Sequence, residues 1–184
     1  MSSKVTDLKE KFKLALTSTA KVIANDFTLN NKNYQNKKSK DSSAIEFEDL
    51  KNPSDFIRLR AETDSAALKK KFSNEAIYRK NLPTNNSSKS LYSIAEKIRY
   101  ESLGGKMLKG IEKNFNENYI QIIHHKRKDQ LKTKEDVPIT EAFELYMLKN
   151  FHHIKLNTLA TKMLNFWEKD FEKSIDKHKK FLQE

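Results

Sequence analysis

The chain has no cysteine, and it has only three glycines and three prolines among its 184 residues. The absence of cysteine excludes disulfide bonds and thiolate metal sites, and it is typical of proteins from a reducing cytoplasm. So little glycine and proline leaves few residues suited to the turns of a β-sandwich or barrel. We therefore expect an all-α fold, a bundle of about five helices in one domain that is long enough to bury a sizeable core.

Long hydrophobic runs are also missing from the sequence. No apolar run approaches the ~18 to 20 residues that are needed to span a bilayer. Near the N-terminus, lysines interrupt the apolar core that a secretory signal peptide would require. These lysines are Lys4, Lys9, Lys11 and Lys13. The sequence therefore predicts no contact with a membrane and a cytoplasmic location.

Basic residues outnumber acidic ones by 36 to 25, which gives a formal net charge of +11. Such a surplus can indicate a nucleic-acid or membrane partner. Most of the basic residues are lysine, however, and the chain is rich in asparagine, a combination that AT-rich coding produces without selection for a partner. Each arginine is more informative, because its planar guanidinium group makes contacts that lysine cannot replace.

Apolar residues at helical spacing predict five helices. They run from about Thr6 to Asp26, Pro53 to Asn81, Ser90 to Asn116, Pro138 to Phe151 and Leu156 to Leu182. Residues 1–27 would form an N-terminal helix and 53–184 the helical bundle, with a flexible connection over 28–52. A short β-hairpin near residues 27–48 is a further expectation, because residues 45–47 alternate in polarity and could pair with 27–29.

Two of the predicted helices carry polar side chains where packing favours carbon. Asp64 and Ser65 interrupt one apolar stripe, and Glu101 interrupts another. Arg60 precedes Asp64 by four residues, and Glu96 precedes Arg99 by three, so each pair lies on one helix face. Because buried ions are normally matched, we predict an interhelical network that pairs Arg60 with Glu101 or Glu96, and Asp64 with Arg99. An interface or ligand contact through the same groups remains the alternative.

All three glycines fall within one window of a predicted helix: Gly104, Gly105 and Gly110. Glycine in a helix interior costs about 1 kcal/mol relative to alanine. Such a cluster favours a close helix crossing or a kink at this point.

In these residues the chain resembles the N-terminal region of the CobT-type subunit of the aerobic, ATP-dependent cobaltochelatase. The resemblance covers roughly Phe12 to Leu182 and rests on the order and spacing of its elements. These are Arg60-Ala61, Asp64-Ser65, Ala67-Leu68, Pro83, Glu96, Arg99, Glu101, Leu103-Gly104, Gly110, Pro138 with Glu141-Ala142, and Phe166-Trp167.

The chain also departs from the family pattern. Ser73, Asn74 and Tyr78 occupy a stretch where family members carry imidazoles, and Met107 lies one place early. The acidic linker and the C-terminal von Willebrand A domain of the family are absent, as is an Asp-x-Ser-x-Ser motif. We therefore expect a fragment or a naturally short relative.

The resemblance implies a role within a larger complex. The family subunit assembles with an AAA+ ATPase subunit, and the pair acts on a large chelatase subunit. That subunit inserts cobalt into hydrogenobyrinic acid a,c-diamide, forming nitrogen–metal bonds on the route to cobalamin. This chain would be a non-catalytic docking module, oligomeric in the complex, while ATP, Mg and cobalt belong to the complex as a whole. Its lack of a Gly-x-x-x-x-Gly-Lys-Ser/Thr phosphate loop agrees with that role.

Two histidine pairs and one basic run are further candidate functional features. The pairs His124-His125 and His152-His153 cannot each present both rings to one ion from a helix, and we expect no metal there. The run Lys126-Arg127-Lys128 leaves a basic nucleic-acid-binding module as the alternative function. Neither a docking motif nor interleaved aromatic residues accompany this run, so nucleic acid is the less favoured partner.

Overall fold

The computed structural model describes residues 2–27, 50–125, 131 and 133–175. Within these residues the fold is all-helical, with eight α-helices, one 3-10 helix and no strand, which confirms the all-α prediction. The elements are α1 (Ser2–Ala24), α2 (Pro53–Phe72), α3 (Glu75–Lys80), α4 (Asn86–Met107), α5 (Lys109–His125), η2 (Lys134–Asp136), α6 (Ile139–Phe151), α7 (Thr158–Asn165) and α8 (Glu168–Ile175).

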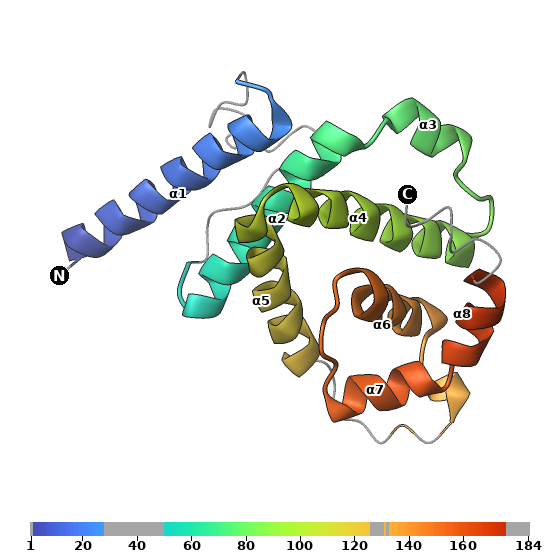
Figure 1. Ribbon diagram of the computed structural model, residues 1–184. Helices are drawn as coiled ribbons and strands as arrows, with labels where there is room; N and C mark the ends of the chain where they lie inside the picture. The colour runs from blue at the N-terminus through green and yellow to red at the C-terminus, as the bar shows by residue number, and fades with distance from the viewer. Residues whose placement is uncertain (1, 28–49, 126–130, 132, 176–184) are drawn as a thin grey trace.

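Helix α4 is central to the packing, because it contacts α2, α5 and α6. Helices α2, α4 and α5 all pack against one another, while α6, α7 and α8 form a second group that joins the first through α4 (Figure 1). Helix α1 extends away from the rest of the molecule and packs chiefly along α2 (Figure 1). The N-terminal helix is therefore attached to the bundle mainly through α2.

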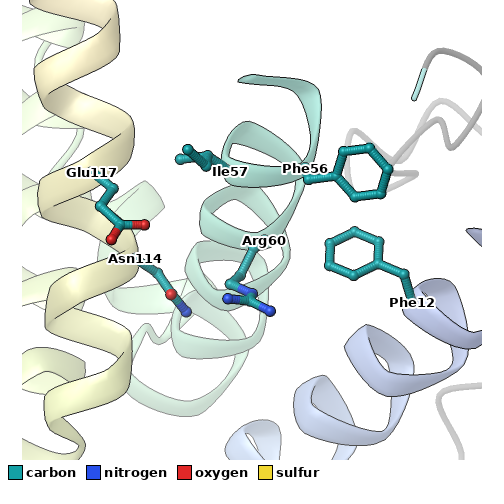
Figure 2. A pocket seen from close by; sticks show the side chains of 6 residues that line it. All are labelled: Phe12, Phe56, Ile57, Arg60, Asn114 and Glu117. Atoms are coloured by element: carbon teal, nitrogen blue, oxygen red, sulfur yellow. The ribbon is translucent and has the colours of Figure 1, made fainter. Parts of the chain in front are cut away.

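A small hydrophobic cluster holds α1 against α2. Its buried members are Leu16, Leu50 and Leu59, and Phe12 and Phe56 pack against them. The two phenylalanine rings meet edge to face with their centroids 5.0 Å apart (Figure 2). This satellite cluster is separate from the main core, to which α1 contributes Ala20 and Ile23 near its C-terminal end.

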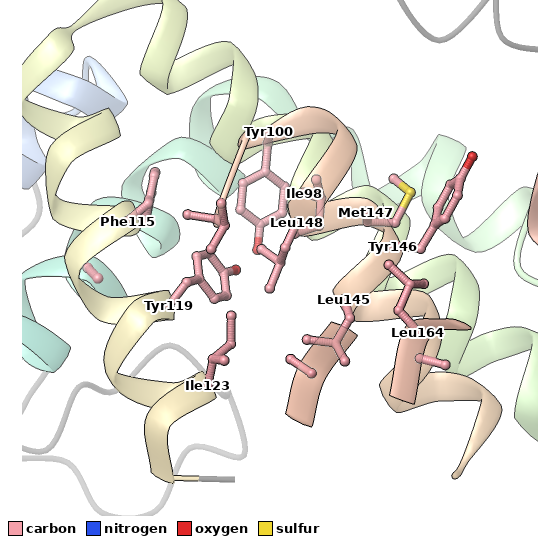
Figure 3. Close-up of a cluster of buried hydrophobic side chains, with 14 of the residues drawn as sticks. Ile98, Tyr100, Phe115, Tyr119, Ile123, Leu145, Tyr146, Met147, Leu148 and Leu164 are labelled. Atoms are coloured by element: carbon pink, nitrogen blue, oxygen red, sulfur yellow. The ribbon is translucent and has the colours of Figure 1, made fainter. Parts of the chain in front are cut away.

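The main core lies chiefly between α2, α4, α5, α6 and α7, and Figure 3 shows the part formed by α4 to α7. Ile98 of α4, Phe115 and Tyr119 of α5, and Leu145 of α6 are each at most 1% exposed. The inward residues of each helix recur at three- and four-residue spacing, which is why amphipathic helices form here. Burial of this apolar surface supplies the main stabilisation of the fold.

The start of α2 is set by its first turn. Pro53 occupies the first helical position, where its missing N–H is no loss. The Asp55 carboxylate accepts hydrogen bonds from the backbone N–H groups of Lys51 and Asn52 at 2.9 and 2.8 Å. These bonds lower the pKa of Asp55, and they fix the register of the helix that carries the predicted polar residues.

Three predicted helices are divided or shifted in the structure. The second ends at Phe72 rather than Asn81, because Asn74 caps a new helix by accepting the Ile77 N–H at 3.1 Å. The third begins at Asn86 instead of Ser90, since Asn85 accepts the N–H groups of Ser87 and Ser88. It ends at Met107, and α5 continues in a new direction that lets its apolar face reach both α2 and α4.

The last predicted helix is also interrupted. A turn at Phe166 and Trp167 separates α7 from α8, and the Trp167 indole N–H donates to the Val137 carbonyl at 3.1 Å. Both helices contact α6, so the apolar period continues through the break. The predicted hairpin and most of the connection fall on residues 28–49, which lie outside the described residues.

The crossing of α2 and α4 depends on Gly104. A Cβ atom at this position would lie 2.3 Å from Cδ1 of Leu68, whose side chain is fully buried. A Cβ at Gly105 would lie 3.3 Å from that of Glu112, whereas one at Gly110 would meet nothing within 4 Å. The close crossing therefore accounts for Gly104, and no packing contact accounts for Gly110.

None of the helices in the described ranges has the length and apolar character that crossing a lipid bilayer requires.

Candidate functional site

The structure separates the six predicted polar residues into two pairs and two single residues. Ser65 and Glu101 lie together in the interior, and Glu96 and Arg99 lie at the end of α2. Asp64 faces α5, and Arg60 lies in a cleft between α1, α2 and α5. The six residues therefore do not form the single network that the sequence predicted.

The interior group joins four segments around the carboxyl group of Glu101, which is 1% exposed. The Ser65 hydroxyl of α2 donates to Oε1 at 2.6 Å, and the Tyr119 hydroxyl of α5 donates to Oε2 at 2.6 Å. His152, just after α6, places Nε2 3.7 Å from Oε2. The buried carboxyl is thus held mainly by hydroxyl groups rather than by the expected Arg60.

Burial dominates the electrostatics of this group. It raises the pKa of Glu101, although the charge of Lys97 and the two hydroxyl donors oppose the shift. Burial also raises the pKa of Tyr119 well above its usual value and lowers the pKa of His152 to about 4. His152 is therefore neutral near pH 7, and its buried Nε2 has no hydrogen-bond partner in the described part of the chain.

The second group caps the end of α2. Arg99 donates to the Glu96 carboxylate at 2.7 and 2.8 Å and to the Phe72 carbonyl at 2.8 Å. The Ser73 hydroxyl donates to Glu96 at 2.5 Å. The hydrogen bond from Arg99 lowers the pKa of Glu96. Arg99 therefore pairs within its own helix instead of with Asp64, and the group supports the junction between α2 and α3.

Asp64 is 1% exposed and takes its hydrogen bond from another helix. The side-chain amide of Asn114 on α5 donates to Oδ2 at 2.7 Å. Burial raises the pKa of Asp64, while the Asn114 bond and the charge of Arg60 oppose the shift. The Asn114 amide therefore takes the place of the predicted partner Arg99, because α5 rather than α4 faces Asp64.

Arg60 is exposed in a small cleft that three helices line (Figure 2). Its guanidinium carbon lies 5.8 Å from the centroid of the Phe12 ring. The cleft has a volume of about 100 Å³. Its lining residues are Phe12 of α1, Phe56, Ile57 and Arg60 of α2, and Asn114 and Glu117 of α5.

Arg60 differs from the other arginines that the structure describes. Arg58 lies 3.1 Å from Glu62, Arg79 lies 2.7 Å from Glu75, and Arg99 lies 2.7 Å from Glu96. Of these four arginines, Arg60 is the one without a carboxylate at salt-bridge distance among the described residues. Its fork of donors is therefore available to a group from outside the chain.

A family model described as "Cobalamin biosynthesis protein CobT" matches residues 7–184. The chain belongs to the CobT family. Membership implies a part in cobalamin biosynthesis as a cobaltochelatase subunit. No curated protein and no solved structure gave a significant match.

Several site residues of this CobT-family chain were not predicted from its sequence. Asn114 and Tyr119 of α5 donate hydrogen bonds to Asp64 and Glu101, and His152, just after α6, lies 3.7 Å from Glu101. Tyr119 falls on the apolar face of α5 and is buried. A tyrosine among apolar residues at helical spacing indicates a buried hydroxyl, which needs a hydrogen-bond partner. Asn114 carried no comparable signal, and His152 was a candidate only as a metal ligand.

The two histidine pairs give no metal centre within the part of this CobT-family chain that the structure describes. Among the described residues, no group of three or more His, Asp or Glu side chains could hold a metal ion. His152 is buried and His153 is exposed, and His124 and His125 lie at the end of α5. The basic run Lys126-Arg127-Lys128 lies outside the described residues.

Proposed function

We propose that this chain is a docking domain of the ATP-dependent cobaltochelatase. In this role it binds the AAA+ ATPase subunit and supports cobalt insertion into hydrogenobyrinic acid a,c-diamide by the large chelatase subunit. The observation that carries the proposal is the family match over residues 7–184. An oligomeric assembly with both partners follows from that role.

The chemistry of the chain supports a non-catalytic part in the complex. The sequence contains no cysteine and no Gly-x-x-x-x-Gly-Lys-Ser/Thr loop for nucleotide phosphates. The buried carboxyl groups of Glu101 and Asp64 are engaged in hydrogen bonds between helices. We therefore assign ATP and Mg to the ATPase subunit, and we treat cobalt as the substrate of the large subunit.

The surface charge indicates the kind of contact. The net charge is +11, and Lys69 and Lys71 are exposed in the last turn of α2. A basic surface of this kind is complementary to an acidic partner, and such complementarity sets specificity and association rate more than affinity. The proposed interface is thus polar and sensitive to salt.

The test is direct binding between the purified chain and the AAA+ subunit of the same organism. Light scattering after size exclusion should detect a complex in low salt, with or without nucleotide, and the complex should weaken as salt is raised. The isolated chain serves as a control and should neither hydrolyse ATP nor insert cobalt. Absence of a complex under all of these conditions would refute the docking function.

A further inference from the structure

We propose that the Arg60 cleft binds one carboxylate side chain of an acidic peptide segment, with a neighbouring apolar side chain of that segment seated on Phe12. The segment belongs to a partner chain, so the inference deepens the proposed docking function and rests on it for the identity of that partner.

The first observation is the state of Arg60. It lacks a carboxylate at salt-bridge distance among the described residues, whereas Arg58, Arg79 and Arg99 each have one. A guanidinium group forms paired, charge-assisted hydrogen bonds with a carboxylate more readily than with other groups. The Arg60 guanidinium carbon lies 5.8 Å from the centroid of the Phe12 ring, and its N–H groups have no hydrogen-bond acceptor among the described residues (Figure 2).

The second observation is the size of the cleft. At about 100 Å³ it is well below the roughly 300 to 1,000 Å³ of typical small-molecule sites. It can accept a single side chain, as the central pockets of protein interfaces do. The dimensions therefore favour a side chain presented by a peptide over a free metabolite.

The third observation is apolar surface beside the arginine. The cleft walls include Phe12, Phe56 and Ile57. Leu8, one turn before Phe12 on α1, is 65% exposed and lies on the same side of that helix. A segment that carries a leucine or similar residue next to its acidic residue would cover this surface and exclude water from the ion pair.

Glu117 determines where the carboxylate can lie. It forms part of the α5 wall of the cleft, and its carboxylate is 3.7 Å from the ammonium group of Lys113. Its negative charge repels an incoming carboxylate from that wall, which directs the ligand toward Arg60. Removal of this charge should therefore strengthen binding, whereas removal of the Arg60 charge should weaken it.

The first experiment measures fluorescence anisotropy of a labelled peptide whose ends are blocked and whose centre is Leu-Glu-Leu. Arg60→Gln should weaken binding at least about tenfold, as expected for a charge-assisted hydrogen bond. Arg58→Gln removes the same charge from the same helix and should change binding less than about twofold, by the small effect of exposed charges. Glu117→Gln should strengthen it. Both arginines are exposed, so neither variant should impair folding.

Several results would overturn the site. These are equal binding of the Leu-Gln-Leu peptide, an equal loss in Arg58→Gln and Arg60→Gln, and an unchanged affinity in Glu117→Gln. Propionate that competes with the peptide at equal concentration would show a site for free carboxylates and not for peptides. As a direct readout, the Arg60 Nε–H signal in a nitrogen-15 spectrum, assigned by its loss in Arg60→Gln, should shift on addition of the peptide.

The second experiment separates this site from the docking function. Arg60→Gln and Arg58→Gln are compared for binding to the AAA+ subunit, and the Arg60 variant should bind more weakly. A partner that binds both variants and the wild type equally leaves the docking function standing and overturns the site. If the peptide binds at Arg60 but the AAA+ subunit binds no form of the chain, the site stands and the proposed function fails.

Discussion

Glu101 shows how a single buried carboxyl group is tolerated in this fold. No arginine or lysine lies at salt-bridge distance from it among the described residues, and the hydroxyls of Ser65 and Tyr119 supply its hydrogen bonds. Burying an unpaired charge costs several kcal/mol, so burial favours the protonated acid and raises the pKa. The group then acts as a polar contact that fixes α2, α4 and α5 relative to one another.

This arrangement predicts different outcomes for two substitutions at Glu101. Glu101→Gln keeps the shape of the side chain and removes the ionisable group, so it should change the free energy of unfolding by less than about 1 kcal/mol. Glu101→Ala leaves a cavity and strands the hydroxyls of Ser65 and Tyr119, and it should destabilise the protein by about 2 to 5 kcal/mol. Urea unfolding measures both. Equal losses in the two variants would mean that the negative charge itself stabilises the fold.

His152 predicts a dependence of stability on pH. Its folded pKa of about 4 lies below the usual value of 6.5, so the folded state binds a proton less readily than the unfolded state. Its contribution is present above pH 6.5 and is lost as the pH falls toward 4, with a maximum of about 3 kcal/mol. Burial is the largest cause, and the charges of Lys97 and His153 add to it.

The measurement compares urea unfolding of the wild type and His152→Gln between pH 7 and pH 4. Glu101 and Asp64 have raised pKa values and shift stability in the opposite direction, but they are present in both proteins. The difference between the two proteins should therefore change in favour of the glutamine variant as the pH falls. A difference that is constant with pH contradicts a neutral, buried His152.

At the scale of the elements, helical periodicity predicted which segments are helical but not where they break. The apolar period runs on through the turns at Leu108 and at Trp167, because the helices on either side face the same core. The interruptions at Asp64 and Glu101 marked buried positions, yet their partners depend on how the helices are rotated against one another. The spacing of residues along one helix gives no information about that rotation. The predicted pairings of Asp64 with Arg99 and of Glu101 with Arg60 were therefore wrong.

The crossing of α2 and α4 gives a prediction at this scale. In Gly104→Ala the new Cβ would lie 2.3 Å from Leu68 Cδ1, so the buried Leu68 side chain or the helices must shift, at a cost of about 1 to 3 kcal/mol. Gly110→Ala is the matched control: its Cβ meets nothing within 4 Å, and the variant should gain about 0.4 to 1 kcal/mol. Urea unfolding measures both, and Leu68→Ala should reduce the loss at Gly104 in a double-mutant cycle. A Gly104→Ala variant as stable as the wild type contradicts the close crossing.

At the scale of the whole molecule, net charge and fold give different information. The charge of +11 is compatible with an acidic protein surface or with nucleic acid, and it does not depend on how the helices pack. The fold places Arg60, which has no carboxylate at salt-bridge distance among the described residues, beside Phe12 and Phe56, and this local feature is suited to one carboxylate. The choice between the docking function and a nucleic-acid-binding module therefore depends on how binding responds to salt and to Arg60.

The last prediction concerns that choice. A generic lysine surface should bind an arbitrary oligonucleotide weakly in low salt, and the binding should disappear by physiological salt, because each phosphate contact releases a counterion. Arg60→Gln and Arg58→Gln should weaken it equally, since each removes one charge from the surface. Fluorescence anisotropy across a salt series measures the slope for each variant. Tight binding that persists at physiological salt, or a selective loss in Arg60→Gln, would assign the basic surface to nucleic acid. Weak and uniform binding would leave the acidic peptide as the ligand that distinguishes Arg60 from its neighbour on α2.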